Sequence, residues 1–156
     1  MPQELNVQDL RIRSSAFDGQ KRIPEEHTGD GEDRAPALEW SGVPDGTKSF
    51  AVVVHDPDAP LVDGFTHWVA YNIPGDASGI PEDGEGVTQG TNSFGNQGYN
   101  GPAPPEGHGP HHYYFMVFAL REEPKLAPDL SLWQLLKEIE PQMLGMNRLV
   151  GTYSRA

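Results

Sequence analysis

The stretch YYFMVFAL, Tyr113–Leu120, most constrains the fold, because all eight of its residues are apolar or aromatic. Successive side chains of a β-strand point to opposite faces of the sheet, so a strand that is apolar at every position needs cover on both faces. The stretch FAVVV, Phe50–Val54, has the same character. Both stretches therefore predict strands in the middle of a sheet or sandwich.

Strands also dominate the rest of the expected order. Alternating apolar residues over 5–12 predict an edge or half-buried strand. Further strands are expected at 21–23, 37–40, 48–55, 66–74, 113–120 and 147–154, and a loop at 75–97. Ser131 is a good N-cap for one late helix, which Pro141 interrupts. With 156 residues, 18 glycines and 15 prolines, the chain is expected to form a single β-rich domain, residues 1–156.

Composition excludes several classes of function. The net charge is −12, from 23 acidic and 11 basic residues, and such a surface repels the phosphates of nucleic acids. A solvated acidic surface explains this charge, and a salt-adapted host is the alternative. The absence of cysteine excludes disulfides and thiolate metal sites and fits a cytoplasmic protein. No apolar run approaches the roughly 20 residues of a transmembrane segment, and the first residues resemble no export signal.

Polar residues that could form a site stand at the ends of the buried strands. Asp56 and Asp58 follow one strand in HDPDAP, a stretch that is by itself an ordinary turn. His111 and Tyr113 open the other strand on one face, and His112 lies on the opposite face. His67 opens a third strand, and His108 is expected at the surface of the preceding loop.

Carboxylates beside imidazoles raise the imidazole pKa and favour its protonated form. An aspartate-oriented pair of histidines therefore predicts a local anion site, with His111, and His67 as a further candidate, donating charge-assisted hydrogen bonds. A metal held by His108, His111, His112 and the aspartates is the alternative. Histidines on opposite faces give poor ligand geometry, and no nucleophile stands beside a base, so we expect no metal, no cofactor and no catalysis.

The stretches DPDAP, THWVAYNIP, GYNGPAPPEGHGPHHYYF and LVGTY follow one another along nearly the whole chain. In this order they resemble the phosphatidylethanolamine-binding protein family, and more closely its prokaryotic Raf kinase inhibitor-like branch. The resemblance implies a mostly β, Greek-key, sandwich-like fold. A large central antiparallel or mixed sheet faces a smaller one, with helix near the C-terminus. The smaller sheet, the helix or a second subunit in a homodimer could cover the central strands.

The resemblance also implies a small pocket for phosphate or phosphorylethanolamine-like groups. Carried over by motif, its residues are Asp56, Asp58, His67, Gly101, Ala103, Pro104, His111 and Tyr113, with Tyr99 and Tyr153 as weaker candidates. The family usually has arginine where this chain has His112. If that arginine pairs with the first aspartate, the environment of Asp56 is less cationic here at neutral pH, and anion binding is expected to be weaker or more dependent on pH.

These observations favour a non-catalytic binding protein for a small anionic ligand, which could regulate a kinase or protease partner. One alternative is a protease or kinase inhibitor that acts through the proline-rich loop 101–110, independently of the pocket. The other is a hydrolase or lyase that uses the Asp, His and Tyr side chains for acid–base chemistry.

Overall fold

The computed structural model describes residues 9–155 and contains two antiparallel sheets and one α-helix. The larger sheet has five strands in the order β6-β4-β3-β7-β8. Their bounds are β3 Ser49–Asp56, β4 Phe65–Pro74, β6 Thr88–Gln89, β7 His111–Leu120 and β8 Met143–Tyr153. The smaller sheet has the order β1-β2-β5, with β1 Arg11–Arg13, β2 Leu38–Ser41 and β5 Gly79–Ile80.

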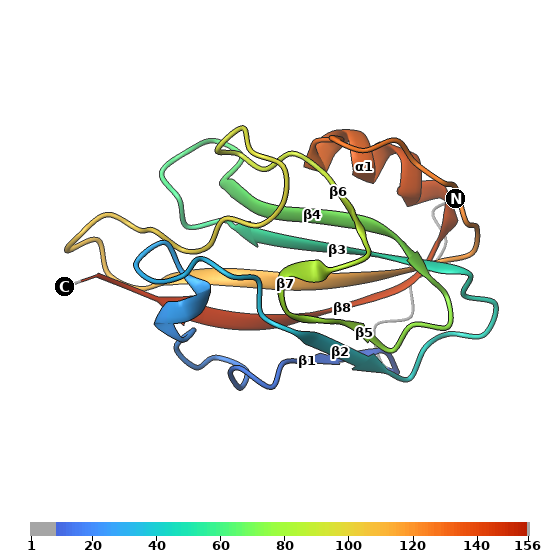
Figure 1. Ribbon diagram of the computed structural model, residues 1–156, viewed down its shortest axis with the longest axis horizontal. Helices are drawn as coiled ribbons and strands as arrows, with labels where there is room; N and C mark the ends of the chain where they lie inside the picture. Colours follow the sequence, from blue (N-terminus) through green and yellow to red (C-terminus); the bar gives the residue numbers. More distant parts are fainter. Residues whose placement is uncertain (1–8, 156) are drawn as a thin grey trace.

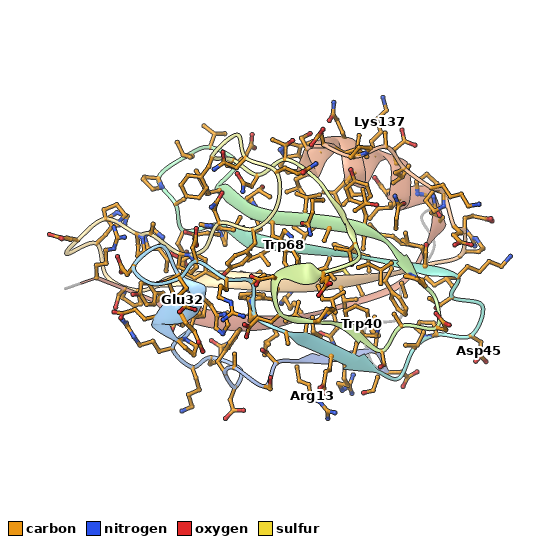
Figure 2. The ribbon with its side chains drawn as sticks, in the orientation of Figure 1. Arg13, Glu32, Trp40, Asp45, Trp68 and Lys137 are labelled. Atoms are coloured by element: carbon orange, nitrogen blue, oxygen red, sulfur yellow. The ribbon has the colours of Figure 1, made fainter. Side chains whose placement is uncertain are left out.

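The larger sheet lies between two covering layers (Figure 1). The smaller sheet covers one face, and Trp40 and Trp68 point into the core between the two sheets (Figure 2). Helix α1, Leu132–Ile139, covers the other face, where Leu135 and Ile139 pack against Val53 and its neighbours. The two covering layers explain why β3 and β7 can be apolar on both faces, and their predicted central position is confirmed.

The predicted start of the helix is also confirmed. The Ser131 side chain accepts a hydrogen bond from the backbone N–H of Gln134, whose own side chain accepts one from the Ser131 backbone. This reciprocal capping box satisfies two backbone donors that a helix start leaves open. A 3₁₀ turn at Glu140–Gln142 follows directly and leads into β8.

Several boundaries differ from the prediction. The expected loop at 75–97 contains the short strands β5 and β6 and the 3₁₀ turn Glu82–Gly84, because their two-residue pairings leave no pattern in the sequence. Strand β8 begins at Met143, before the predicted position, and residues 21–23 contribute one bridge, from Arg22 to Thr152. Of the strand predicted over 5–12, only β1 is described, and residues 1–8 lie outside the described part.

The predicted fold class is confirmed: the protein is mostly β, with a larger antiparallel sheet, a smaller sheet and a helix near the C-terminus. Another 3₁₀ turn, Glu25–His27, precedes β2. Within residues 9–155, no helix has the length and apolar character needed to cross a membrane.

Candidate functional site

A cavity of about 250 Å³ lies where β3 ends and where β4 and β7 begin. Six of the eight predicted site residues line it: Asp56, His67, Ala103, Pro104, His111 and Tyr113. Six residues that the sequence analysis did not name complete the lining: Ala59, Pro60, Leu61, Phe65, Phe94 and Pro105. The cavity therefore combines a few polar groups with an apolar rim, as small-molecule sites commonly do.

A buried aspartate–histidine pair forms part of this cavity. Nδ1 of His111 donates to Oδ2 of Asp56 over 2.7 Å, and the two side chains are only 4% and 3% exposed. The other carboxylate oxygen of Asp56 accepts the backbone N–H of Asp58 at 2.8 Å. Because both oxygens are engaged, the carboxylate is fixed and holds the His111 ring in one orientation.

His108 contacts this pair from the loop before β7. Its Nδ1 lies 2.6 Å from Nε2 of His111, which extends the chain of hydrogen bonds from Asp56 to the surface. The sequence analysis expected His108 at the surface, and the residue is exposed. Its contact with His111 was missed, because nothing in the sequence shows that the loop folds back over the site.

His67 is held differently from His111. Its Nδ1 lies 2.7 Å from the backbone carbonyl of Asn100, to which it donates. Burial lowers the His67 pKa from 6.5 to about 4, so the ring is neutral at pH 7 and its Nε2 carries a lone pair. The expectation that His67 donates to an anion at this position therefore does not fit its protonation.

Tyr113 supplies a hydroxyl that stays protonated. The residue is 1% exposed, and its ring meets that of His67 edge to face with centroids 5.3 Å apart. Burial, and then the nearby charge of Asp56, raise the Tyr113 pKa well above its usual value. The hydroxyl is therefore a hydrogen-bond donor at every physiological pH.

Asp58 and His112 form a separate pair outside the cavity. Oδ2 of Asp58 accepts both the backbone N–H and Nδ1–H of His112, each at 2.7 Å, and both side chains are more than two-fifths exposed. Burial alone would raise the Asp58 pKa, but these hydrogen bonds outweigh it and lower that pKa. His112 thus stands beside the second aspartate, and Asp56 has His111 as its partner.

Gly101 lies behind the cavity and does not line it. Its backbone N–H donates to Oδ1 of Asp33 over 2.6 Å. A Cβ at this position would collide with the backbone carbonyl of His27, so the glycine permits a close approach of two loops. The structural reason for this glycine is the packing of its loop against residues 27–33.

Arg155 holds the loop 101–110, which supplies Ala103, Pro104 and Pro105 to the cavity lining. Arg155 donates from Nη1 to the carbonyl of Pro104 at 3.3 Å, and its own carbonyl accepts the N–H of Gly107 at 3.2 Å. The weaker candidates lie outside the cavity lining: the Tyr99 hydroxyl donates to the His27 carbonyl and the Tyr153 hydroxyl to Asp30.

Of the cavity residues that the sequence analysis did not name, Phe65 could have been predicted from its spacing. Phe65 stands two residues before His67, and this spacing on a strand places both side chains on one face. Phe94 and the segment Ala59–Leu61 come from loops, whose path the sequence does not reveal. In residues 9–155, no cluster of three or more His, Asp or Glu side chains could hold a metal ion.

Comparisons with known proteins agree with this architecture. The family model described as phosphatidylethanolamine-binding protein matches residues 13–154. A UPF0098 protein of Pyrococcus horikoshii is 44% identical over 150 residues, which cover 91% of this chain and 75% of the relative. A UPF0098 protein of Aquifex aeolicus is 40% identical over 153 residues, covering 94% and 89% of the two chains.

The solved structure of Escherichia coli YbcL, described as a new member of the mammalian PEBP family, superposes with a TM-score of 0.89. It is 33% identical to this chain, and the match covers 96% of this chain and 100% of YbcL. Together with the family match over 13–154, this similarity identifies the chain as a member of the phosphatidylethanolamine-binding protein family.

Proposed function

We propose that the protein is a non-catalytic binding protein whose cavity holds a small anionic ligand, a phosphate or a phosphorylated head group. The observation that carries the proposal is the buried Asp56–His111 pair at the cavity wall, continued to His108. A carboxylate that accepts from one ring nitrogen orients the imidazole, so that the other ring nitrogen faces an anion in a fixed direction.

The cavity offers two kinds of donor to such an anion. The Tyr113 hydroxyl is one. Nε2 of His111 is the other, once a ligand oxygen takes the place that Nδ1 of His108 holds at 2.6 Å. The rim residues Leu61 and Phe94 keep water from the ligand, which strengthens each polar contact. These local donors act against the net charge of −12, which repels anions from the rest of the surface.

Replacement of His111 tests the proposal. His111→Ala removes the ring that links Asp56 to the ligand, and we expect binding of inorganic phosphate and phosphorylethanolamine to be lost in isothermal titration calorimetry. Tyr113→Phe removes one hydroxyl and should weaken binding about tenfold. If an unpaired Asp56 prevents His111→Ala from folding, Tyr113→Phe still tests whether the anion binds in this cavity. His112→Ala changes the neighbouring histidine outside the cavity and is the matched control.

The outcomes are distinct. Folded His111→Ala and Tyr113→Phe proteins that bind phosphate as tightly as the wild type would exclude this cavity as the anion site. A loss of binding in His112→Ala that equals the loss in His111→Ala would point to the exposed Asp58–His112 pair instead.

A protein partner is a second candidate, and the exposed apolar residues beside the cavity favour it. Leu61 and Phe94 are 58% and 48% exposed, and Val62 is fully exposed. Inhibition of a protease or kinase through this rim and the loop 101–110 should be weakened by Val62→Ser and unaffected by His111→Ala. Protease and kinase panels test inhibition, and light scattering tests whether the rim instead joins two copies in a homodimer.

A further inference from the structure

We infer that His67 acts as a fixed hydrogen-bond acceptor that makes the cavity select oxyanions carrying a proton, above all phosphomonoester monoanions. This specificity rests on the proposed anion site, and it assigns His67 a role opposite to that of a donor. Anions of equal size and charge that lack a proton, such as sulfate monoesters, should be rejected.

The tautomer of His67 follows from its backbone contact. Nδ1 lies 2.7 Å from the carbonyl oxygen of Asn100. A carbonyl can only accept, so Nδ1 must carry the proton. In the neutral ring, Nε2 then carries a lone pair and no hydrogen, and it is the remaining polar atom of a side chain that lines the cavity.

The carbonyl that sets this tautomer is itself fixed from several directions. The Asn100 side chain donates to Oδ2 of Asp33 over 2.9 Å, while its Oδ1 accepts from Asn92 over 2.9 Å. The backbone N–H of Asn100 donates to the carbonyl of His67 over 3.1 Å, and the next N–H, of Gly101, donates to Asp33. A segment tied at all of these points cannot move to release the His67 ring.

Aromatic neighbours also keep the ring from turning over. The rings of Phe65, Phe94 and Tyr113 surround it, with centroids 5.0, 6.0 and 5.3 Å from that of His67. A ring flip would place a carbon against the Asn100 carbonyl and take the His67 hydrogen bond from this part-buried oxygen, which is costly. Nε2 of His67 therefore keeps its orientation in the cavity wall.

The charged and titratable groups around His67 leave the ring neutral. On β3 stand Asp56, which favours the charged ring, and His55, which opposes it; Asp33 favours it from the loop behind. His111 and Tyr113 face the same cavity from β7. Burial outweighs the carboxylates and holds the pKa at about 4, below the second pKa of phosphomonoesters near 6.

A ligand oxygen without a proton would meet the Nε2 lone pair with a lone pair of its own. Both atoms would lose their hydrogen bonds to water and gain none, which corresponds to a tenfold to hundredfold loss of affinity, roughly. A phosphomonoester monoanion has one P–OH to donate to Nε2 of His67. Its further oxygens can accept from Tyr113 and from Nε2 of His111, where one of them replaces His108.

Methyl phosphate and methyl sulfate provide a matched test, because at pH 5 both are singly charged and only the phosphate carries a proton. In calorimetric titrations of the wild-type protein at pH 5, we expect methyl phosphate to bind tenfold to a hundredfold more tightly, roughly. The ratio of the two affinities should fall about tenfold per pH unit above about pH 6, as the phosphate loses its proton. The sulfate does not titrate, so its own pH dependence reports the protein groups.

His67→Gln tests the residue itself, because a glutamine amide can turn to donate as well as accept, and the ratio should approach one. His27→Gln is the control: His27 is another buried histidine whose Nδ1 lies 2.7 Å from a carbonyl, that of Arg34, and it lies outside the cavity. Long-range ¹H–¹⁵N NMR should show protonated Nδ1 and bare Nε2 for His67 in the wild type, which needs no variant to fold.

The results separate the two proposals. If neither anion binds at any pH, the proposed function is wrong. If both bind with equal affinity at pH 5, or NMR finds the proton of His67 on Nε2, the anion site stands and the selectivity of His67 is refuted.

Discussion

Asp33→Asn should destabilise the protein and loosen the cavity, although Asp33 does not line it. The carboxylate accepts two hydrogen bonds, from the N–H of Gly101 at 2.6 Å and from the side chain of Asn100 at 2.9 Å. An asparagine offers one oxygen and one NH₂ group, so one of the two donors would face another donor. The backbone of Asp33 has φ 60°, which asparagine tolerates, so strain does not contribute to the loss.

The expected size follows from one lost hydrogen bond to a charged acceptor, about 1.5–3 kcal/mol. For a chain of 156 residues, each kcal/mol lowers Tm by about 2–4 °C, so Tm should fall by roughly 3–12 °C. Urea unfolding followed by fluorescence gives the free energy, and calorimetry gives Tm. The affinity for methyl phosphate should fall as well, because the Asn100 carbonyl no longer holds His67 in place.

Asp83→Asn is the matched control. Asp83 has φ 67°, close to that of Asp33, but its carboxylate lies at the surface, 53% exposed, and pairs with Arg34 at 3.3 Å. Exposed ion pairs of this kind contribute little, so this variant should unfold like the wild type. Equal and small losses of stability in both variants would refute the structural role of the Asp33 carboxylate.

Two further predictions concern the same region. Gly101→Ala should lower Tm strongly, because its Cβ would collide with the His27 carbonyl. Gly107→Ala is the control: its Cβ meets no atom within 4 Å, so it should cost only the strain of φ 71°, about 1–2 kcal/mol. Equal losses of Tm in the two variants would contradict this explanation. Burial lowers the His67 pKa from 6.5 to about 4. Between pH 6.5 and 4, His67 is therefore mostly protonated in the unfolded chain and mostly neutral in the folded protein. Stability should therefore fall from pH 6.5 to 4, by about 3 kcal/mol as an order of magnitude, and urea unfolding of His67→Gln should lack this component.

The core of the fold could be predicted because it depends on local alternation. The stretches around Val53 and Phe115 are apolar at every position, and burial on both faces is the physical consequence. The same alternation predicted that His111 and Tyr113 share a face, and both are buried there while His112 faces outward. Short strands such as β5 and β6 are held by tertiary pairing alone, so no local pattern predicts them.

The parts of the site that escaped prediction depend on where loops run. Asp33 and Asn100 are far apart in the sequence and meet because two loops cross behind the cavity. The contact of His108 with His111 likewise depends on a fold-back of loop 101–110. Composition identifies these stretches as loops but does not specify their path, so the residues that set protonation in the cavity were the least predictable.

The position of the site follows from strand register together with one irregularity. In an antiparallel sheet, the end of β3 lies beside the starts of both β4 and β7, and Asp56 pairs with Phe65 while His55 pairs with Tyr114. Between Val54 and His55 the register with β4 shifts, so β4 has one extra residue there. Such a bulge re-aims a side chain: His67 joins the cavity beside Asp56, while its neighbour Trp68 still packs in the core between the sheets. Without the bulge, strict alternation would place His67 and Trp68 on opposite faces of the sheet. With Trp68 in the core, His67 would then point away from the cavity, and the proposed acceptor for the ligand would be absent.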